Sequence, residues 1–208
     1  MNTARFRPRP LAITVLLASA LWFITFALPW GSFWIKISLS ASLLAGISFI
    51  LQPTRREEFR FDLRAVLIGL ASAALLYFIF WSGRAVATAL FDFAGRQIDG
   101  IYQKGGGTPL WVIALLLFCV TGPSEEIFWR GYLQRNLMLR FGRWPGWAIA
   151  TVIYAGVHIW SLNFMLVGAA AVAGAFWGAM YAHLGRLAPV ILSHALWSSV
   201  IFAVFPMR

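Results

Sequence analysis

The stretch PLWVIALLLFCVTGPSEEIFWRG (Pro109 to Gly131) decides how the rest of this sequence is read. Its first half is a continuous apolar run, and its second half carries two adjacent glutamates, Glu125 and Glu126, followed by Arg130. An apolar run of roughly 17–25 residues is long enough to cross a lipid bilayer as a helix. The stretch therefore predicts a membrane helix that carries charged side chains.

The composition of the whole chain supports a membrane protein. The 208 residues are 61% hydrophobic and 12% charged, with a mean hydropathy of +0.77. Soluble domains carry about 25% charged residues, so a water-soluble globule is excluded. The alternating ten-residue segments of a transmembrane barrel are absent. We therefore expect an all-α, polytopic membrane protein, whose single cysteine, Cys119, excludes an intrachain disulfide.

Hydropathy and helix-breaking residues predict about seven transmembrane helices. The expected spans are Leu11–Leu28, Phe33–Leu51, Ala65–Trp81, Pro109–Gly131, Trp147–Trp160, Phe164–Ala182 and Leu187–Phe205. The apolar run of the first span continues to Leu28, too far past the small residues Ala18–Ala20 for a cleaved signal peptide. We expect that span to be retained.

A longer connector, Ser82 to Thr108, separates the third and fourth spans. Its apolar residues recur near helical spacing among charged ones, which predicts an amphipathic helix lying on the membrane surface. It ends in KGGGTP (Lys104–Pro109), a flexible hinge before a helix start. We therefore divide the chain into N-terminal helices with their connector, 1–108, and a C-terminal core, 109–208, within one integral membrane unit.

The net charge of +10 is distributed in a way that predicts topology. With a cytoplasmic N-terminus, the basic residues expected in the cytoplasm are Arg5, Arg7, Arg9, Arg55, Arg56, Arg60, Arg64, Arg135, Arg140, Arg143 and Arg186. Those expected outside are Lys36, Arg84, Arg96, Lys104 and Arg208. Cytoplasmic loops carry the excess of Lys and Arg, so this orientation is favoured. The basic residues then face anionic lipid, and a nucleic-acid partner is not expected.

The two glutamates need a reason to lie in a membrane helix. A charged side chain at the bilayer centre costs about 2.5–3.5 kcal/mol, and such residues usually face the protein interior or a hydrated cavity. Glu126 and Arg130 are four positions apart and share one helix face, whereas Glu125 points about 100° away. We expect Glu126 to be neutralised by Arg130 and Glu125 to stay free as a general base. The alternative is that both glutamates mark the water interface.

The residues before the glutamates predict an interruption. Gly122 and Pro123 should break or kink the helix because proline cannot donate a hydrogen bond to the previous turn. A new helix starting near Ser124 would direct backbone N–H groups toward the two carboxylates.

Two histidines lie in later spans. At 1.5 Å of rise per residue, Glu125 and His194 are each roughly 10 Å from the cytoplasmic boundary and His158 roughly 16 Å. The three side chains could converge on one site in the inner half of the membrane. A single histidine in a span is more often a packing residue, but two at the depth of a glutamate pair favour a site. His183 is expected at the interface.

At these positions the sequence resembles a known family. EEIFWR matches an EExxxR motif, YAGVH approximates FxxxH, and HALWS approximates HxxxN, in this order on three spans. The pattern is similar to that of the CPBP family, which contains CaaX prenyl endoproteases and bacteriocin-processing intramembrane proteases. The resemblance covers about Pro109 to Phe205.

The resemblance implies a glutamic-type intramembrane endopeptidase that needs no metal. By this resemblance Glu125 is the base that activates the hydrolytic water, His158 assists it, and His194 stabilises the oxyanion of the tetrahedral intermediate. Glu126 and Arg130 support the site. The depths counted above place the expected cleavage near the cytoplasmic face, and the size of the chain and the type of family favour a multi-pass protein of the cell membrane, such as a bacterial inner membrane. The partners would be a peptide or protein substrate and the lipid bilayer.

Two supporting positions depart from the family pattern. Tyr154 stands where the family usually has Phe and adds a hydroxyl to the cavity wall. Ser198 stands where an Asn is expected, and its shorter side chain can bond its own helix backbone. Loss of one oxyanion donor costs about 2.7–4 kcal/mol in a serine protease. Ser198 fills the role with adjusted geometry, another donor replaces it, or activity is weak or lost.

Two other functions fit the same residues. Glu125 or Glu126 with His158 and His194 could bind zinc and leave one coordination position to water, although no HExxH helix is present. The protein could also bind a peptide without cutting it, as an immunity-type membrane protein would.

Overall fold

The chain folds into a bundle of long helices. The computed structural model describes residues 8–207, and over that range it contains helices and no strand. The main helices are α1 (Pro8–Ala27), α2 (Phe33–Leu51), α3 (Leu63–Leu90), α4 (Ala94–Gln103), α5 (Leu110–Leu116), α6 (Gly122–Glu126), α7 (Arg135–Phe141), α8 (Arg143–Val157), α9 (Phe164–Leu184) and α10 (Ala188–Ser199). The 3₁₀-helical segments are η1 (Arg56–Phe59) and η4 (His158–Ser161), and the π-helical segments are η2 (Leu117–Thr121), η3 (Ile127–Gln134) and η5 (Val200–Val204).

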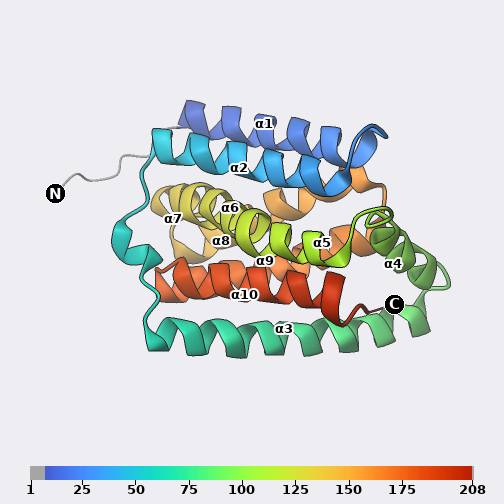
Figure 1. Cartoon of the computed structure of the whole chain (residues 1–208). Coiled ribbons are helices and arrows are strands. Elements are labelled where there is room, and N and C mark those ends of the chain that lie inside the picture. The colour runs from blue at the N-terminus through green and yellow to red at the C-terminus, as the bar shows by residue number, and fades with distance from the viewer. Residues whose placement is uncertain (1–7, 208) are drawn as a thin grey trace.

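The long helices lie side by side and alternate in direction (Figure 1). The pair α1 and α2 forms one side of the bundle, and α3 with α10 forms the opposite side. The helix that carries the glutamates runs between these pairs, with α8 and α9 packed against each other behind it. This arrangement surrounds the glutamates with helices from both halves of the chain.

The two ends of the bundle differ in charge. We call one end, which holds the start of α1, the α2–α3 connection and the end of α7, the arginine-rich end. Its described basic residues are Arg9, Arg55, Arg56, Arg60, Arg64, Arg135, Arg140, Arg143 and Arg186. The opposite end, which we call the α4 end, holds α4 and the C-terminal residues (Figure 1). The predicted topology residues Arg5, Arg7 and Arg208 lie outside the described residues.

Five helices among residues 8–207 are long and apolar enough to cross a membrane: Arg9–Ala27, Phe33–Leu51, Leu63–Leu90, Leu110–Phe141 and Phe164–Leu184. A sixth, Ala188–Val204, is apolar but shorter. The expected span Trp147–Trp160 falls largely in α8, which has 15 residues. A helix of that length rises only about 22 Å, less than the roughly 30 Å of a bilayer core. A multi-pass all-α protein is confirmed, and the count of seven spans is not.

The amphipathic connector is shorter than predicted. Residues 82–90 continue α3, which runs from Leu63 to Leu90, and only α4 remains as a separate amphipathic helix. Its Gln97 binds the start of α9: the Gln97 carbonyl accepts from Asn163 Nδ2 at 2.7 Å, and Gln97 Oε1 accepts from the Met165 N–H at 3.0 Å. The helix is therefore attached to the bundle by specific hydrogen bonds.

Of the break or kink expected at Gly122 and Pro123, the break is wrong. The backbone stays helical from Leu110 through Phe141, with π-helical turns at η2 and η3 on either side of α6. The wider turn before Pro123 accommodates a residue that cannot donate a backbone hydrogen bond. No new helix begins at Ser124, so the backbone N–H groups there do not stabilise the carboxylates as a helix N-terminus would.

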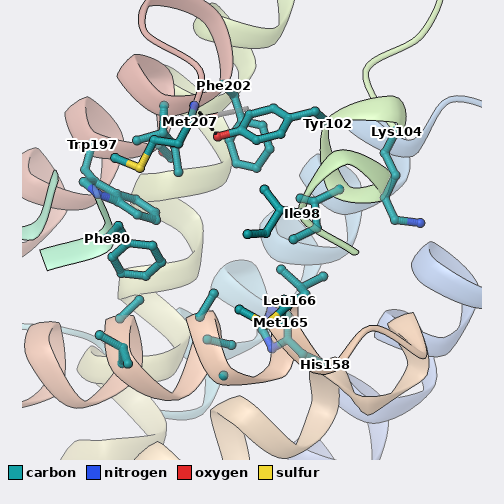
Figure 2. Close-up of a pocket in the computed structure, with 18 of the residues that line it drawn as sticks. Phe80, Ile98, Tyr102, Lys104, His158, Met165, Leu166, Trp197, Phe202 and Met207 are labelled. Carbon is teal, nitrogen blue, oxygen red and sulfur yellow. Dashed lines mark hydrogen bonds between the residues drawn. The ribbon is translucent and has the colours of Figure 1, made fainter. Parts of the chain in front are cut away.

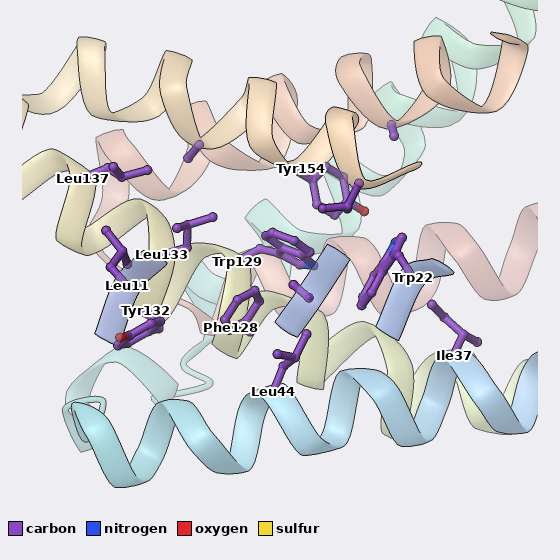
Figure 3. Close-up of a cluster of buried hydrophobic side chains, with 14 of the residues drawn as sticks. Leu11, Trp22, Ile37, Leu44, Phe128, Trp129, Tyr132, Leu133, Leu137 and Tyr154 are labelled. Atoms are coloured by element: carbon purple, nitrogen blue, oxygen red, sulfur yellow. The ribbon is translucent and has the colours of Figure 1, made fainter. Parts of the chain in front are cut away.

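The core joins the two halves of the chain. Trp22 of α1 and Leu44 of α2 pack in one buried cluster with Phe128, Trp129 and Leu133 of η3 (Figure 3). The rings of Trp22 and Trp129 meet edge to face, with centroids 5.5 Å apart. Such pairs contribute roughly 0.5–1.5 kcal/mol beyond their burial. The N-terminal helices therefore help to fix the helix that carries the glutamates.

Candidate active site

One cavity of about 410 Å³ brings the predicted polar residues together. Its wall includes Glu125 of α6, Tyr154 of α8, His158 of η4, and both His194 and Ser198 of α10. Figure 2 shows His158 on one side of this space and Tyr102 and Lys104 on the side of α4. The expected convergence of the glutamate and both histidines is therefore present in the structure.

Glu125 faces the cavity with a single side-chain hydrogen-bond donor. The Tyr154 hydroxyl donates to Glu125 Oε2 at 3.0 Å, and both residues are buried. No ion pair to Glu125 occurs among the described residues, so Glu125 has no salt-bridged cation of its own. This is the arrangement expected of a carboxylate that can accept a proton.

Glu126 points away from the cavity into a charged cluster. Its Oε1 accepts from Arg130 Nη1 at 2.9 Å and from His194 Nδ1 at 2.6 Å, and its side chain is fully buried. Arg130 also donates from Nη2 to the Gly174 carbonyl at 3.3 Å. The ion pair inferred from the four-residue spacing therefore forms, and it extends to a catalytic candidate, His194.

Two contacts hold the ring of His194. The Trp177 ring stacks on it with centroids 3.9 Å apart and planes inclined by 17°. Trp177 is itself fixed because its Nε1 donates to Ser193 Oγ at 3.1 Å. Because Nδ1 is engaged by Glu126, Nε2 is the nitrogen of His194 left for a molecule in the cavity.

The hydrogen bonds of His158 define its tautomer. Indole nitrogen can only donate, and Trp22 Nε1 lies 3.3 Å from His158 Nε2, which must then accept. His158 Nδ1 therefore carries the proton and donates to the Tyr154 carbonyl at 2.8 Å. Sequence reasoning missed Trp22 because no spacing links residues 136 positions apart.

Ser198 does not extend a free donor into the cavity. Its hydroxyl donates to the His194 carbonyl at 2.7 Å, with the Ala195 carbonyl at 3.4 Å. A hydroxyl has one hydrogen, so this bond uses its donor capacity. The hydroxyl therefore bonds its own helix backbone, as the shorter side chain allows, and in this conformation Ser198 does not fill the role of the replaced Asn.

The rest of the cavity is largely aromatic and apolar. Its rings come from all sides: Phe26, Phe33, Trp34, Phe80, Phe91, Phe164, Trp177, Trp197 and Phe202. The cations of the lining, Arg84 and Lys104, come from α3 and from the hinge that follows α4. Burial, and secondarily Lys36, lowers the pKa of the Lys104 ammonium below its usual range. The cavity thus runs from the polar residues toward the α4 end.

His183 lies apart from this site. It is exposed, its ring centroid is 5.0 Å from that of Trp144, and it is absent from the cavity wall. The interfacial position expected for it stays a prediction.

Within residues 8–207, no group of three or more His, Cys, Asp or Glu side chains is arranged to hold a metal ion. Glu125, His158 and His194 share the cavity wall without forming such a group. Zinc binding stays a hypothesis, which metal analysis of the purified protein can test.

Residues 107–200 match the family model described as type II CAAX prenyl endopeptidase Rce1-like. The match confirms the resemblance to the CPBP family over this region. The matched family is a family of proteases. The matched residues include Glu125, His158 and His194. None of the curated proteins and none of the solved structures matches the chain.

Proposed function

We propose that this chain, whose residues 107–200 carry the Rce1-like match, is a glutamic-type intramembrane endopeptidase. The observation that supports the proposal most is the shared cavity: Glu125, His158 and His194 come from three helical segments and line one space. A buried carboxylate without a paired cation, in a cavity that two imidazoles also line, has the residue types of general acid–base hydrolysis.

In the proposed reaction Glu125 removes a proton from a water molecule. The water oxygen attacks the carbonyl carbon of the peptide bond, and the carbonyl electrons move to its oxygen. Glu125 then gives the proton to the amide nitrogen as the C–N bond breaks. Preorganised donors at the developing oxyanion supply much of the rate enhancement in such reactions.

His194 suits the oxyanion because of its partner. Glu126 Oε1 lies 2.6 Å from His194 Nδ1, and this hydrogen bond orients the ring so that Nε2 is the nitrogen that can reach a peptide oxygen in the cavity. Arg130 balances the charge of Glu126. Glu126 and Arg130 thereby act through His194 and do not touch the substrate.

His158 is proposed to assist the water. Its Nε2 is occupied by Trp22 at 3.3 Å, which is longer than the usual distance of about 2.9–3.0 Å for such bonds. A water molecule in the cavity can replace this contact, while the Nδ1 bond to the Tyr154 carbonyl keeps the ring oriented.

We propose that the substrate enters from the α4 end. Counting residues along the helices led to an expected cleavage site near the cytoplasmic face, but the cavity extends away from the arginine-rich end. With the arginine-rich end in the cytoplasm, the entrance lies on the outer side of the membrane. This proposal replaces the expectation of access from the cytoplasm.

The cavity wall supports an apolar or lipid-modified peptide as substrate. Aromatic side chains dominate the lining, and such surfaces bind alkyl or isoprenoid chains by excluding water. The name of the matched family makes a prenylated CAAX peptide the first probe to use.

The test uses purified full-length protein in lipid vesicles. The probes are a quenched fluorescent peptide ending in a prenylated CAAX sequence and the same peptide without the prenyl group. Cleavage of either by the native protein, lost in Glu125→Gln, supports the proposal. Binding of both peptides without cleavage would favour the non-catalytic alternative, and cleavage lost on chelation and restored by zinc would favour the metal-dependent one.

A further inference from the structure

We propose that Tyr154 is a catalytic residue whose hydroxyl donates a hydrogen bond to the oxyanion, in place of the amide donor that Ser198 does not supply. This inference rests on the proposed peptidase function. It assigns a chemical role to the hydroxyl that distinguishes this chain from the FxxxH pattern.

The first observation is the position of the hydroxyl. Tyr154 Oη lies 3.0 Å from Glu125 Oε2, and both side chains line the cavity. A water held by Glu125 and a carbonyl attacked by that water must therefore lie close to this hydroxyl. An oxyanion donor has to be in that neighbourhood to act.

The second observation concerns Ser198. Its hydroxyl donates to the His194 carbonyl, one turn back on the same helix. Two departures from the family pattern therefore occur in one cavity, one removing a donor and the other adding one. Tyr154 lies on α8 and Ser198 on α10, so the two side chains approach the cavity from different helices.

The third observation is that Tyr154 is held rigidly. The Arg130 guanidinium lies 4.7 Å from its ring centroid, and the Trp129 ring meets it edge to face at 5.1 Å. On the side of α9 only a glycine fits, because a Cβ at Gly174 would lie 2.8 Å from Tyr154 Cδ1. A donor fixed before the reaction begins does not have to reorganise during it.

The reaction itself can redirect the hydroxyl. Before attack, the phenol donates to the charged carboxylate of Glu125, and hydrogen bonds to charged acceptors are roughly twice as strong as neutral ones. When Glu125 takes the proton from water, that acceptor becomes neutral and the peptide oxygen becomes negative. The phenol keeps its proton throughout and shifts its hydrogen bond to the new charge.

If Tyr154 only orients Glu125 and does not touch the oxyanion, the expected effect of an amide at position 198 is different. In that case an amide at position 198 could not compensate for loss of the phenol. Rescue by that amide is therefore the discriminating result.

The test is a double-mutant cycle with Tyr154→Phe, Ser198→Asn and the two combined, measured on the peptide that the native protein cleaves. We expect Tyr154→Phe to lower kcat about 10²–10³-fold with little change in KM, as loss of an oxyanion donor does. In the Ser198→Asn background the same change should cost far less. An equal loss in both backgrounds, or full activity of Tyr154→Phe, would overturn the proposal.

The matched control is Tyr181→Phe. The Tyr181 hydroxyl donates to Glu58 Oε2 at 2.9 Å, so this change also removes a buried phenol bound to a carboxylate, but away from the cavity. It should alter thermal stability and leave kcat near the native value. Equal losses of kcat in the two variants would show that the effect is structural.

Fluorinated tyrosines at position 154 provide a second measurement if Tyr154→Phe fails to fold. They keep the size of the ring nearly unchanged and make the hydroxyl a stronger donor, so kcat should rise with phenol acidity while the hydroxyl stays protonated. A kcat independent of acidity would contradict the proposal. If the native protein cleaves no peptide, the peptidase function itself fails; native cleavage with an unaffected Tyr154→Phe removes only the role of Tyr154.

Discussion

Glu125 and Glu126 are neighbours in the chain and have opposite surroundings. Glu126 is fully buried and accepts from Arg130 and His194, whereas Glu125 faces the cavity and accepts from Tyr154. The helical rotation of about 100° per residue separates them in this way. Sequence spacing could predict the Glu126–Arg130 pair because it is local. The hydrogen bonds to Tyr154 and His194 depend on how distant helices pack, and residue spacing in the sequence cannot predict that packing.

Replacing Glu126 should destabilise the fold as well as the site. Glu126→Gln leaves Arg130 buried without its carboxylate partner, and removing one member of a buried pair costs about 3–5 kcal/mol. Thermal unfolding in detergent should show a clearly lower midpoint. Glu57→Gln, a change at an exposed glutamate, is the control. A midpoint for Glu126→Gln equal to that of the control would contradict the role given to the ion pair.

The helix from Leu110 to Phe141 shows what can and cannot be predicted for an element. Its apolar run and the position of its glutamates were readable from composition and period. Its continuity through Pro123 was not, because the π-helical segments η2 and η3 that flank α6 pack against α2, α8 and α10, which are distant in the sequence. The extension of α3 through residues 82–90 was missed for a similar reason, since mixed polarity there resembled a connector.

Close approach between α8 and α9 makes a specific prediction. Gly174→Ala would place a methyl group 2.8 Å from Tyr154 Cδ1, and overpacking of this kind typically costs about 1–3 kcal/mol. We expect a lower unfolding midpoint and reduced cleavage. Gly168→Ala, on the same helix with nothing within 4 Å of the added carbon, is the control for stability. Equal midpoints for the two variants would show that α9 does not fix Tyr154.

At the scale of the whole molecule, the charge difference between the ends predicts the orientation in the membrane. The sequence predicted a multi-pass protein and an excess of basic residues on one side, and the chain segments that carry most of the described arginines meet at the arginine-rich end in Figure 1. The direction of the cavity could not be predicted, because it depends on α4 folding over the bundle between α3 and α9. Division of the chain at residues 108 and 109 stays a prediction, although the two parts share one buried cluster.

Cysteine labelling tests the proposed orientation. In a Cys119→Ala background, Asp92→Cys marks the α4 end and Glu57→Cys marks the arginine-rich end; both positions are exposed. A membrane-impermeant maleimide added to intact spheroplasts should label the first and spare the second. Lysed membranes should allow labelling of both. The reverse pattern in intact spheroplasts would place the cavity entrance in the cytoplasm.

Isotope incorporation into the cleaved peptide tests the central claim most directly. The full chain in lipid vesicles is incubated with the cleaved probe in water enriched in ¹⁸O, and the products are weighed by mass spectrometry. A single ¹⁸O in the newly formed carboxylate, together with loss of product in a folded Glu125→Gln variant, is the predicted result. Products that form at the native rate in Glu125→Gln, with the same isotope content, would contradict the assignment of Glu125 as the base that activates water.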